Sequence, residues 1–258
     1  MSLNQEQQKE MKEILKESLR AKFENYKPES ASMPFHTRLL GKDRMALFSF
    51  IHSLNTNFGT TIFEPIALKL AKSNFRIVAG QKNAGMQISD GSQREIQYII
   101  DDISAGNIKP NKIEETERIR KVSQEGRMCK VKLTRIGVFL ENSDGEKFLF
   151  DIKTAKPNKG NFKEFKRTLL EWVAAIFAEN PKVKVNTLIA IPYNPYEPKP
   201  YDRWTMAGML DIPNELKVAE EFWDFLSGEG SYKDLLDCFE QVGIELSDEI
   251  NNYFEKYK

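Results

Sequence analysis

An acidic and a basic side chain stand two positions apart in the segment FLFDIK, residues 148–153. Side chains alternate between the two faces of a β-strand, so Asp151 and Lys153 should share one face while their apolar neighbours turn to the core. A carboxylate can hold Mg²⁺, and a nearby ammonium can orient or deprotonate water or stabilise developing negative charge. The pair therefore suits metal-assisted hydrolysis of a phosphodiester. An ordinary exposed strand carrying an Asp–Lys pair would give the same short pattern.

The chain has 258 residues with 38 basic and 38 acidic side chains, so its formal net charge is zero. The charges are unevenly distributed along the sequence. Residues 147–184 carry nine Lys and Arg against four Asp and Glu, whereas residues 215–258 carry twelve acids against four bases. This segregation is compatible with one basic face for a polyanion and one acidic flank, although solvated charges without a partner would look the same.

No run of eighteen apolar residues is present, and the N-terminal segment lacks the apolar core of a signal peptide. The two cysteines are 109 positions apart and belong to no Cys/His cluster. These features predict a cytoplasmic protein in a reducing compartment, with no membrane partner, no disulfide framework and no zinc site.

Hydrophobic periodicity predicts a chain of helices interrupted by a central group of strands. Helices are expected over the first twenty-odd residues, over 44–54 as a buried helix, from Thr60 or Thr61 to 75, and over 90–104, 161–179, 215–226 and 232–242. Strands are expected over 131–141, 148–153 and 183–194, with Asp144-Gly145 turning the first hairpin. The order predicts an α/β fold, with a mixed central sheet flanked by helices, in a single domain over 1–258 that begins with a helical segment.

The Asp-x-Lys tripeptide on the second strand of a hairpin, followed by a basic loop, resembles the PD-(D/E)xK nuclease superfamily. Three longer runs resemble the TdeIII-type restriction endonucleases over most of the chain, namely DIKTAKPNKGNFKEFKRTLLEW, IAIPYNPYEPKPYDRWT and EEFWDFLSGEGSYKDLL. The resemblance implies a restriction-endonuclease-like fold. It also implies a type II site-specific deoxyribonuclease that uses Mg²⁺, and no nucleotide cofactor, to cut both strands of DNA at a short palindromic-type site of the GGNCC class. A near-palindromic site mirrors two-fold protein symmetry, so we expect a homodimer.

Members of the superfamily commonly carry a glutamate on the helix before the hairpin, and Glu64 in GTTIFEPIALKLA takes that position. The first acid of the PD motif is missing, because the expected position on the strand before the turn is Gly137. Three explanations stay open. The second metal ligand comes from elsewhere, with Glu64 first and Glu164 or Glu171 next; the register is wrong; or the chain is an inactive variant.

Basic and amide side chains after the Asp-x-Lys strand are the candidates for DNA phosphate contacts. They are Lys156, Asn158, Lys163, Lys166 and Arg167. Reading of bases calls for forked donors such as Arg203, Arg38 or Arg44, since an arginine can bind guanine through two hydrogen bonds. Most lysines on a helix face are simply solvated, so about half of these candidates are expected to make no contact with a phosphate.

Three functions therefore fit the sequence. In the first, the chain is a magnesium-dependent endonuclease with Asp151, Lys153 and Glu64 as catalytic residues, and Asp151 and Glu64 as metal ligands. In the second, it is a catalytically impaired DNA-binding protein with a nuclease fold, because of Gly137. A nuclease of the same superfamily directed at RNA or at DNA repair is a third, and differs by substrate.

Overall fold

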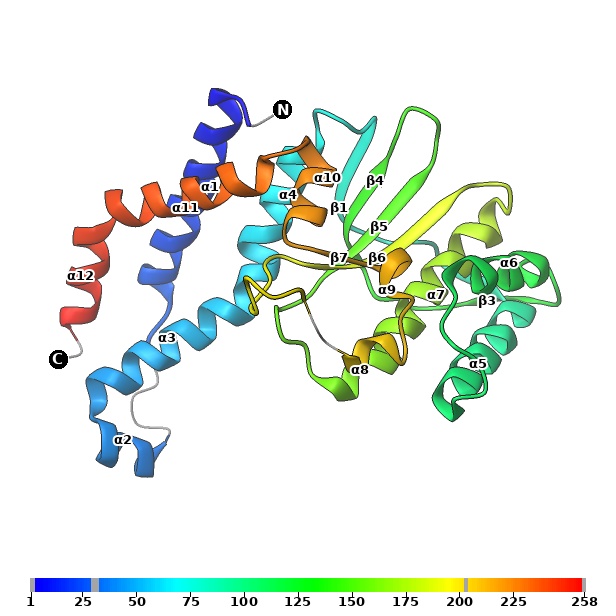
Figure 1. Ribbon diagram of the computed structural model, residues 1–258, viewed down its shortest axis with the longest axis horizontal. Helices are drawn as coiled ribbons and strands as arrows, with labels where there is room; N and C mark the ends of the chain where they lie inside the picture. Colours follow the sequence, from blue (N-terminus) through cyan, green and yellow to red (C-terminus); the bar gives the residue numbers. More distant parts are fainter. Residues whose placement is uncertain (1–2, 29–32, 202–203, 257–258) are drawn as a thin grey trace.

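A five-stranded mixed sheet forms the centre of the computed structural model, which describes residues 3–28, 33–201 and 204–256 (Figure 1). The strand order is β1-β4-β5-β6-β7. The strands are β1 (Ile77–Lys82), β4 (Ile136–Glu141), β5 (Lys147–Ile152), β6 (Val185–Ile191) and β7 (Leu216–Val218). The first three pair antiparallel, whereas β5, β6 and β7 pair parallel. This arrangement confirms the predicted mixed sheet.

Helices cover both faces of the sheet and form two separate hydrophobic cores. One core gathers apolar side chains of α5 (Asp90–Ala105), α6 (Lys112–Val122) and α7 (Phe162–Glu179). The other gathers those of α1 (Gln5–Asn25), α4 (Glu64–Ala71), α10 (Glu220–Ser227) and α11 (Ser231–Glu245). Phe150 and Ile152 of β5 face the second core and Leu149 faces the first, as strand alternation requires.

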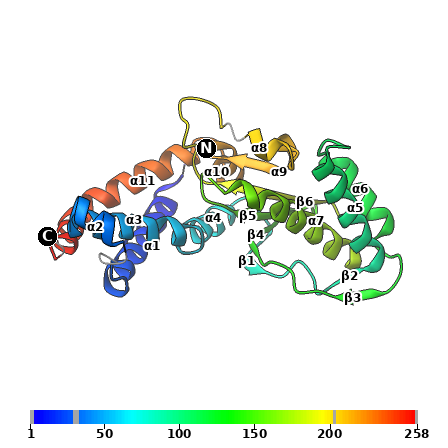
Figure 2. The ribbon, with the colours of Figure 1, turned by 90° about the horizontal axis from the view of Figure 1, so that it is seen from below.

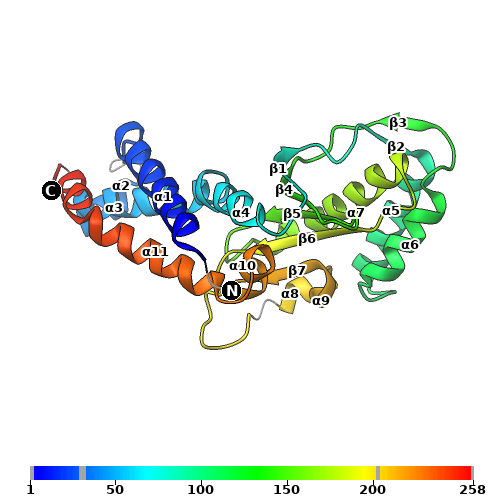
Figure 3. The ribbon, with the colours of Figure 1, turned by 90° about the horizontal axis from the view of Figure 1, so that it is seen from above.

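The molecule is elongated because helices extend from the sheet on one side (Figures 2 and 3). This group comprises α1, α2 (Pro34–Leu40), α3 (Lys42–Phe58), α11 and α12 (Ser247–Glu255). The small elements that remain are β2 (Gln87–Ser89) paired with β3 (Met128–Lys130), α8 (Trp204–Ala207), α9 (Ile212–Glu215) and a 3₁₀ turn over Lys159–Asn161. Within the described ranges, no helix is both long and apolar enough to cross a membrane.

The sequence predictions for α3 and α4 need correction. The segment 44–54 is helical, but Leu47, Phe48 and Ile51 are exposed, so the helix is not buried as expected. No N-cap at Thr60 or Thr61 starts a second helix, because a π-helical turn over Gly59–Phe63 joins α3 directly to α4. The predicted hairpin turn is present, and Gly145 adopts the left-handed conformation with φ +78°.

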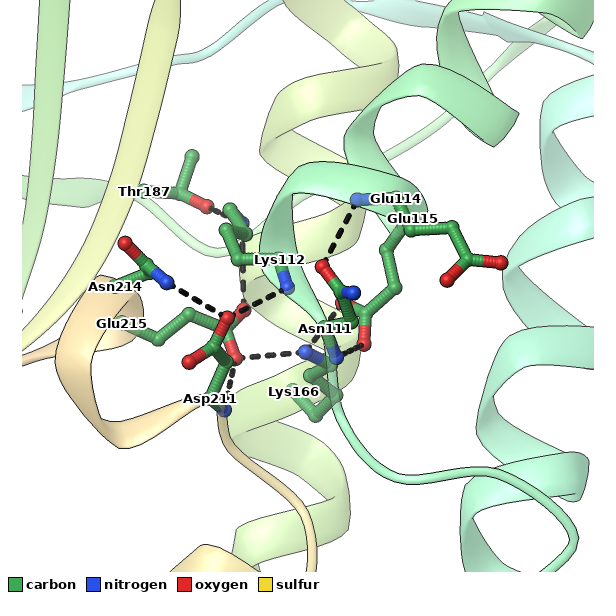
Figure 4. A network of polar contacts seen from close by, with 9 residues as sticks. All are labelled: Asn111, Lys112, Glu114, Glu115, Lys166, Thr187, Asp211, Asn214 and Glu215. Carbon is green, nitrogen blue, oxygen red and sulfur yellow. Dashed lines mark hydrogen bonds and ion pairs between the residues drawn. The ribbon is translucent and has the colours of Figure 1, made fainter.

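A buried cluster of charges joins α6, α7, α9 and β6 (Figure 4). The ammonium of Lys166 lies 2.7 Å from Glu215 Oε2 and also pairs with Glu115. Lys112 Nζ lies 3.3 Å from Glu215 Oε1 and donates a hydrogen bond to the hydroxyl of Thr187. Two lysines thus face two glutamates, and the pairing offsets the large cost of removing these charges from water.

Replacing Lys166 by alanine should lower the free energy of unfolding by about 3–5 kcal/mol, because it leaves two glutamates buried without a full partner. Lys163 is the matched control, since it lies one turn away on α7 and is exposed, with only a 3.9 Å contact to Asp101. Its alanine variant should lose less than about 1 kcal/mol. Urea unfolding of both variants measures the difference, and similar losses would contradict a structural role for the cluster.

Candidate active site

A cleft of about 760 Å³ opens at the end of the sheet where β5 and β6 finish. Because these two strands are parallel, their carboxyl ends lie at the same end of the sheet. Lys153, which follows β5, and Tyr193, which follows β6, both line the cleft there. The opposite wall comes from the junction of α3 and α4, with His52, Phe63 and Glu64 among its lining residues. The cleft therefore brings together three segments that are far apart in the sequence.

Asp151 and Lys153 form a close ion pair at this end of the sheet. Lys153 Nζ lies 2.8 Å from Asp151 Oδ2. The lysine side chain is 29% exposed and the aspartate side chain is 14% exposed. The ammonium also lies 4.8 Å from the ring centroid of Phe165 on α7. Burial raises the pKa of Asp151, while the charge of Lys153 and the hydrogen bond from it act in the opposite direction. The structure brings the two side chains together, as strand alternation predicts.

Glu64 lines the cleft, and it is buried at 9% exposure. Asp151 is not among the lining residues and reaches the cleft through its ion pair with Lys153, which lines it. Glu64 begins α4 directly after the π-helical turn, and Pro65 follows it in the first turn of α4. Burial raises the pKa of Glu64, a hydrogen bond from Gln81 lowers it, and the charge of Asp151 raises it further. The two carboxylates therefore lie close enough to repel one another. By contrast, Glu164 and Glu171, the other predicted candidates, do not line the cleft.

Gly137 lies beside this pair of acids. The antiparallel pairing of Val138 with Phe150 places Gly137 next to Asp151 at the same end of the sheet. A Cβ atom built at Gly137 would lie 3.0 Å from Glu64 Oε1. A longer side chain at this position would therefore meet Glu64 directly. Gly137 thus lies opposite Asp151 across the hairpin, where β4 offers no acidic side chain.

Gln81 is a residue of the site that the sequence did not indicate. Its amide Nε2 donates a 2.6 Å hydrogen bond to Glu64 Oε2, and its backbone has φ +50°. A non-glycine residue in this conformation costs about 1–3 kcal/mol and is often found where the surrounding structure holds a functional side chain in place. The residues around Gln81 on β1 carry no motif, so no signal in one sequence could have found it.

The predicted DNA contacts separate into two groups. Lys156 and Asn158 line the cleft, and Lys156 Nζ lies 5.1 Å from the ring centroid of Tyr196. Lys163 and Arg167 lie further along α7 and face α5, where Arg167 donates a 2.8 Å hydrogen bond to Gln97. The location of Lys166 in the buried cluster contradicts its prediction, because a side chain with no exposed surface cannot meet a phosphate. Arg203 lies outside the described residues.

Carboxylate oxygens are the kind of ligand that a hard divalent cation prefers, and few of them lie near the cleft. Among the residues described, no group of three or more His, Cys, Asp or Glu side chains is placed to hold a metal ion. Mg²⁺ commonly binds through only one or two carboxylates and keeps water and substrate oxygens as its other ligands. Glu64 and Asp151 are the two carboxylates that the structure brings to this end of the sheet, and burial raises the pKa of both.

Comparison with known proteins supports the same class of chemistry. The family model described as "Type II restriction endonuclease, HinfI" matches residues 3–243. The type II restriction enzyme HgiCII of Herpetosiphon aurantiacus is 26% identical over 221 residues, which cover 84% of this chain and 80% of that protein. The type II restriction enzyme MjaII of Methanocaldococcus jannaschii is 27% identical over 253 residues, which cover 87% of this chain and 67% of that protein.

Replacing Glu64 by glutamine should raise the free energy of unfolding of the metal-free protein near neutral pH by about 0.5–2 kcal/mol. Glutamine keeps the shape and can still accept the hydrogen bond from Gln81, while the repulsion with Asp151 disappears. Glu164→Gln, at an exposed position in the first turn of α7, is the control and should change stability little. Urea unfolding in EDTA tests this, and a less stable Glu64→Gln variant would mean that the charge of Glu64 is already compensated.

Proposed function

Because the chain belongs to the HinfI family of type II restriction endonucleases, we propose that it cuts both strands of DNA with Mg²⁺ held by Asp151 and Glu64. Enzymes of this class act on double-stranded DNA at specific sites and generally use a divalent metal ion. The observation that carries the proposal is the meeting of Glu64, Asp151 and Lys153 at one end of the sheet.

Each of these residues has a distinct role in the proposed reaction. When bound, Mg²⁺ would supply positive charge at the scissile phosphate and lower the pKa of bound water. Asp151 and Glu64 would hold the cation, and their burial keeps competing water away from their oxygens. Lys153, fixed between Asp151 and the ring of Phe165, would orient the attacking water or stabilise the charge that develops on the phosphate.

Glu64 substitutes for the missing first acid in this proposal. Its carboxylate occupies the space beside Gly137, where the side chain of an aspartate on β4 would otherwise project. A carboxylate from α4 thus reaches the position that a carboxylate from β4 would reach. The absence of a side chain at Gly137 is what leaves room for Glu64.

The same glycine supports a second candidate, a DNA-binding protein with impaired catalysis. In that case the site has lost one acidic ligand, and Glu64 alone is too weak a replacement. Such a protein would bind its site without cutting it, and restoring an aspartate at Gly137 would restore cleavage.

The DNA would lie across the cleft, with Lys156 and Asn158 nearest to the reacting phosphate and Lys163 and Arg167 on the flank. Such contacts supply affinity and register and become weaker as the salt concentration rises. The resemblance to TdeIII-type enzymes suggests a site of the GGNCC class. A palindromic site of this kind fits a homodimer in which each subunit cuts one strand.

Asp151→Asn should abolish Mg²⁺-dependent cleavage, and Lys153→Ala should slow it by about 10²–10⁴-fold. The effect on binding of the DNA should be small by comparison, because neither side chain supplies most of the phosphate contacts. Lys147→Ala, at the opposite end of β5, is the control and should keep full activity. Plasmid digestion with Mg²⁺ or EDTA, alongside gel-shift titration, separates these effects. Cleavage that survives Asp151→Asn would refute the proposed site.

A swap of acids between α4 and β4 decides between the two candidate functions. If Glu64 is the working ligand, the chain cleaves plasmid and Glu64→Ala does not, while adding Gly137→Asp to Glu64→Ala, which clears the space beside Gly137, restores part of the activity. If the chain is impaired, it does not cleave and Gly137→Asp alone creates Mg²⁺-dependent cleavage. Failure of all four proteins to cut DNA carrying the GGNCC sequence would count against the endonuclease proposal with that specificity.

A further inference from the structure

Exposed apolar side chains concentrate on α2 and the first half of α3. Fourteen large hydrophobic side chains are exposed in the described part of the chain, and half of them fall within residues 33–51. Phe35 and Leu39 are the most exposed, at 85% and 82%. The others are Met33, Leu40, Leu47, Phe48 and Ile51. We call these seven residues the arm face.

The helix α2 has no core of its own. None of its residues is buried, and it packs mainly against α3, to which Gly41 connects it. In Figure 1 it lies at the far end of α3, away from the sheet. A seven-residue helix is not stable in water without packing of an apolar face. Phe35 and Leu39, which are four positions apart and so share one side of α2, turn that apolar face outward.

The arm face has the size of a protein interface. A large side chain presents roughly 150–250 Å² when fully exposed, so at their fractional exposures the seven residues present on the order of 700 Å². A stable dimer buries about 800 Å² on each partner, which the arm face and its immediate surroundings can supply.

The arm face also adjoins the cleft. The ring of Phe48 stacks on His52 with the centroids 6.0 Å apart, and His52 lines the cleft. A partner seated on the arm face would therefore lie beside the bound DNA. DNA itself is a poor occupant of the face, because phosphates bind cationic and hydrogen-bonding groups and not phenylalanine and leucine side chains.

We propose that the arm face binds the arm face of a second copy of this chain around a two-fold axis. This inference rests on the proposed function, because a chain with one cleft needs a second cleft to cut the second strand. Residues that contact their own equivalents make a closed, self-complementary interface. The contact would bring the two clefts to neighbouring positions along one duplex.

The test compares Phe35→Glu/Leu39→Glu with a matched control, Met86→Glu/Ile113→Glu. The control residues are 73% and 70% exposed and lie on other elements. Sedimentation equilibrium, with and without DNA carrying the GGNCC sequence, should show that the unchanged chain and the control are dimers. The arm variant should have a dimer dissociation constant at least tenfold larger. On supercoiled plasmid it should accumulate nicked circles, since single subunits cut one strand at a time.

Circular dichroism checks that the variants fold. The milder pair Phe35→Ala/Leu39→Ala should weaken the dimer in the same direction. A dimer constant unchanged by both arm variants would overturn the inference, as would an unchanged chain that stays monomeric with DNA. Either result combined with normal double-strand cleavage leaves the proposed function standing. A dimer that depends on the arm face but never cleaves would instead remove the proposed function and keep the interface.

Discussion

The buried carboxylate of Glu64 and the half-buried carboxylate of Asp151 lie near the single ammonium group of Lys153 at the end of the sheet. Burial raises the pKa values of both Glu64 and Asp151, and the charge of Asp151 raises the pKa of Glu64 further. Lys153 offsets only part of the charge, and Gln81 adds a single neutral donor. Such a site is costly for the folded chain, as groups that serve binding or catalysis often are.

The buried cluster around Lys166 shows the opposite arrangement. There two lysines face two glutamates within the protein interior, so positive and negative charges balance without any added ion. The cluster joins α6, α7, α9 and β6, and α7 also carries Phe165 to the side of Lys153. Charge balance thus distinguishes the cluster that holds the helices together from the cleft, where the carboxylates of Glu64 and Asp151 outnumber the ammonium group beside them.

The sequence predicts the central part of the fold because its signals are local. The Asp144-Gly145 turn and the alternation in β5 determine the hairpin and place Asp151 beside Lys153. The sequence does not predict the bond between Gln81 and Glu64, because that contact depends on how β1 pairs with β4. Lys166 was misassigned because a lysine in a basic run looks solvated until its buried partners, Glu115 and Glu215, are placed around it.

The π-helical turn over Gly59–Phe63 makes α3 and α4 one unbroken rod. One end of this rod carries Leu47, Phe48 and Ile51, and the other end carries Glu64. A helix is stiff along its axis, and a wider turn within it is a common place for bending at functional sites. Displacement of the outer end would therefore be transmitted along the helical backbone to the π-helical turn, which directly precedes Glu64.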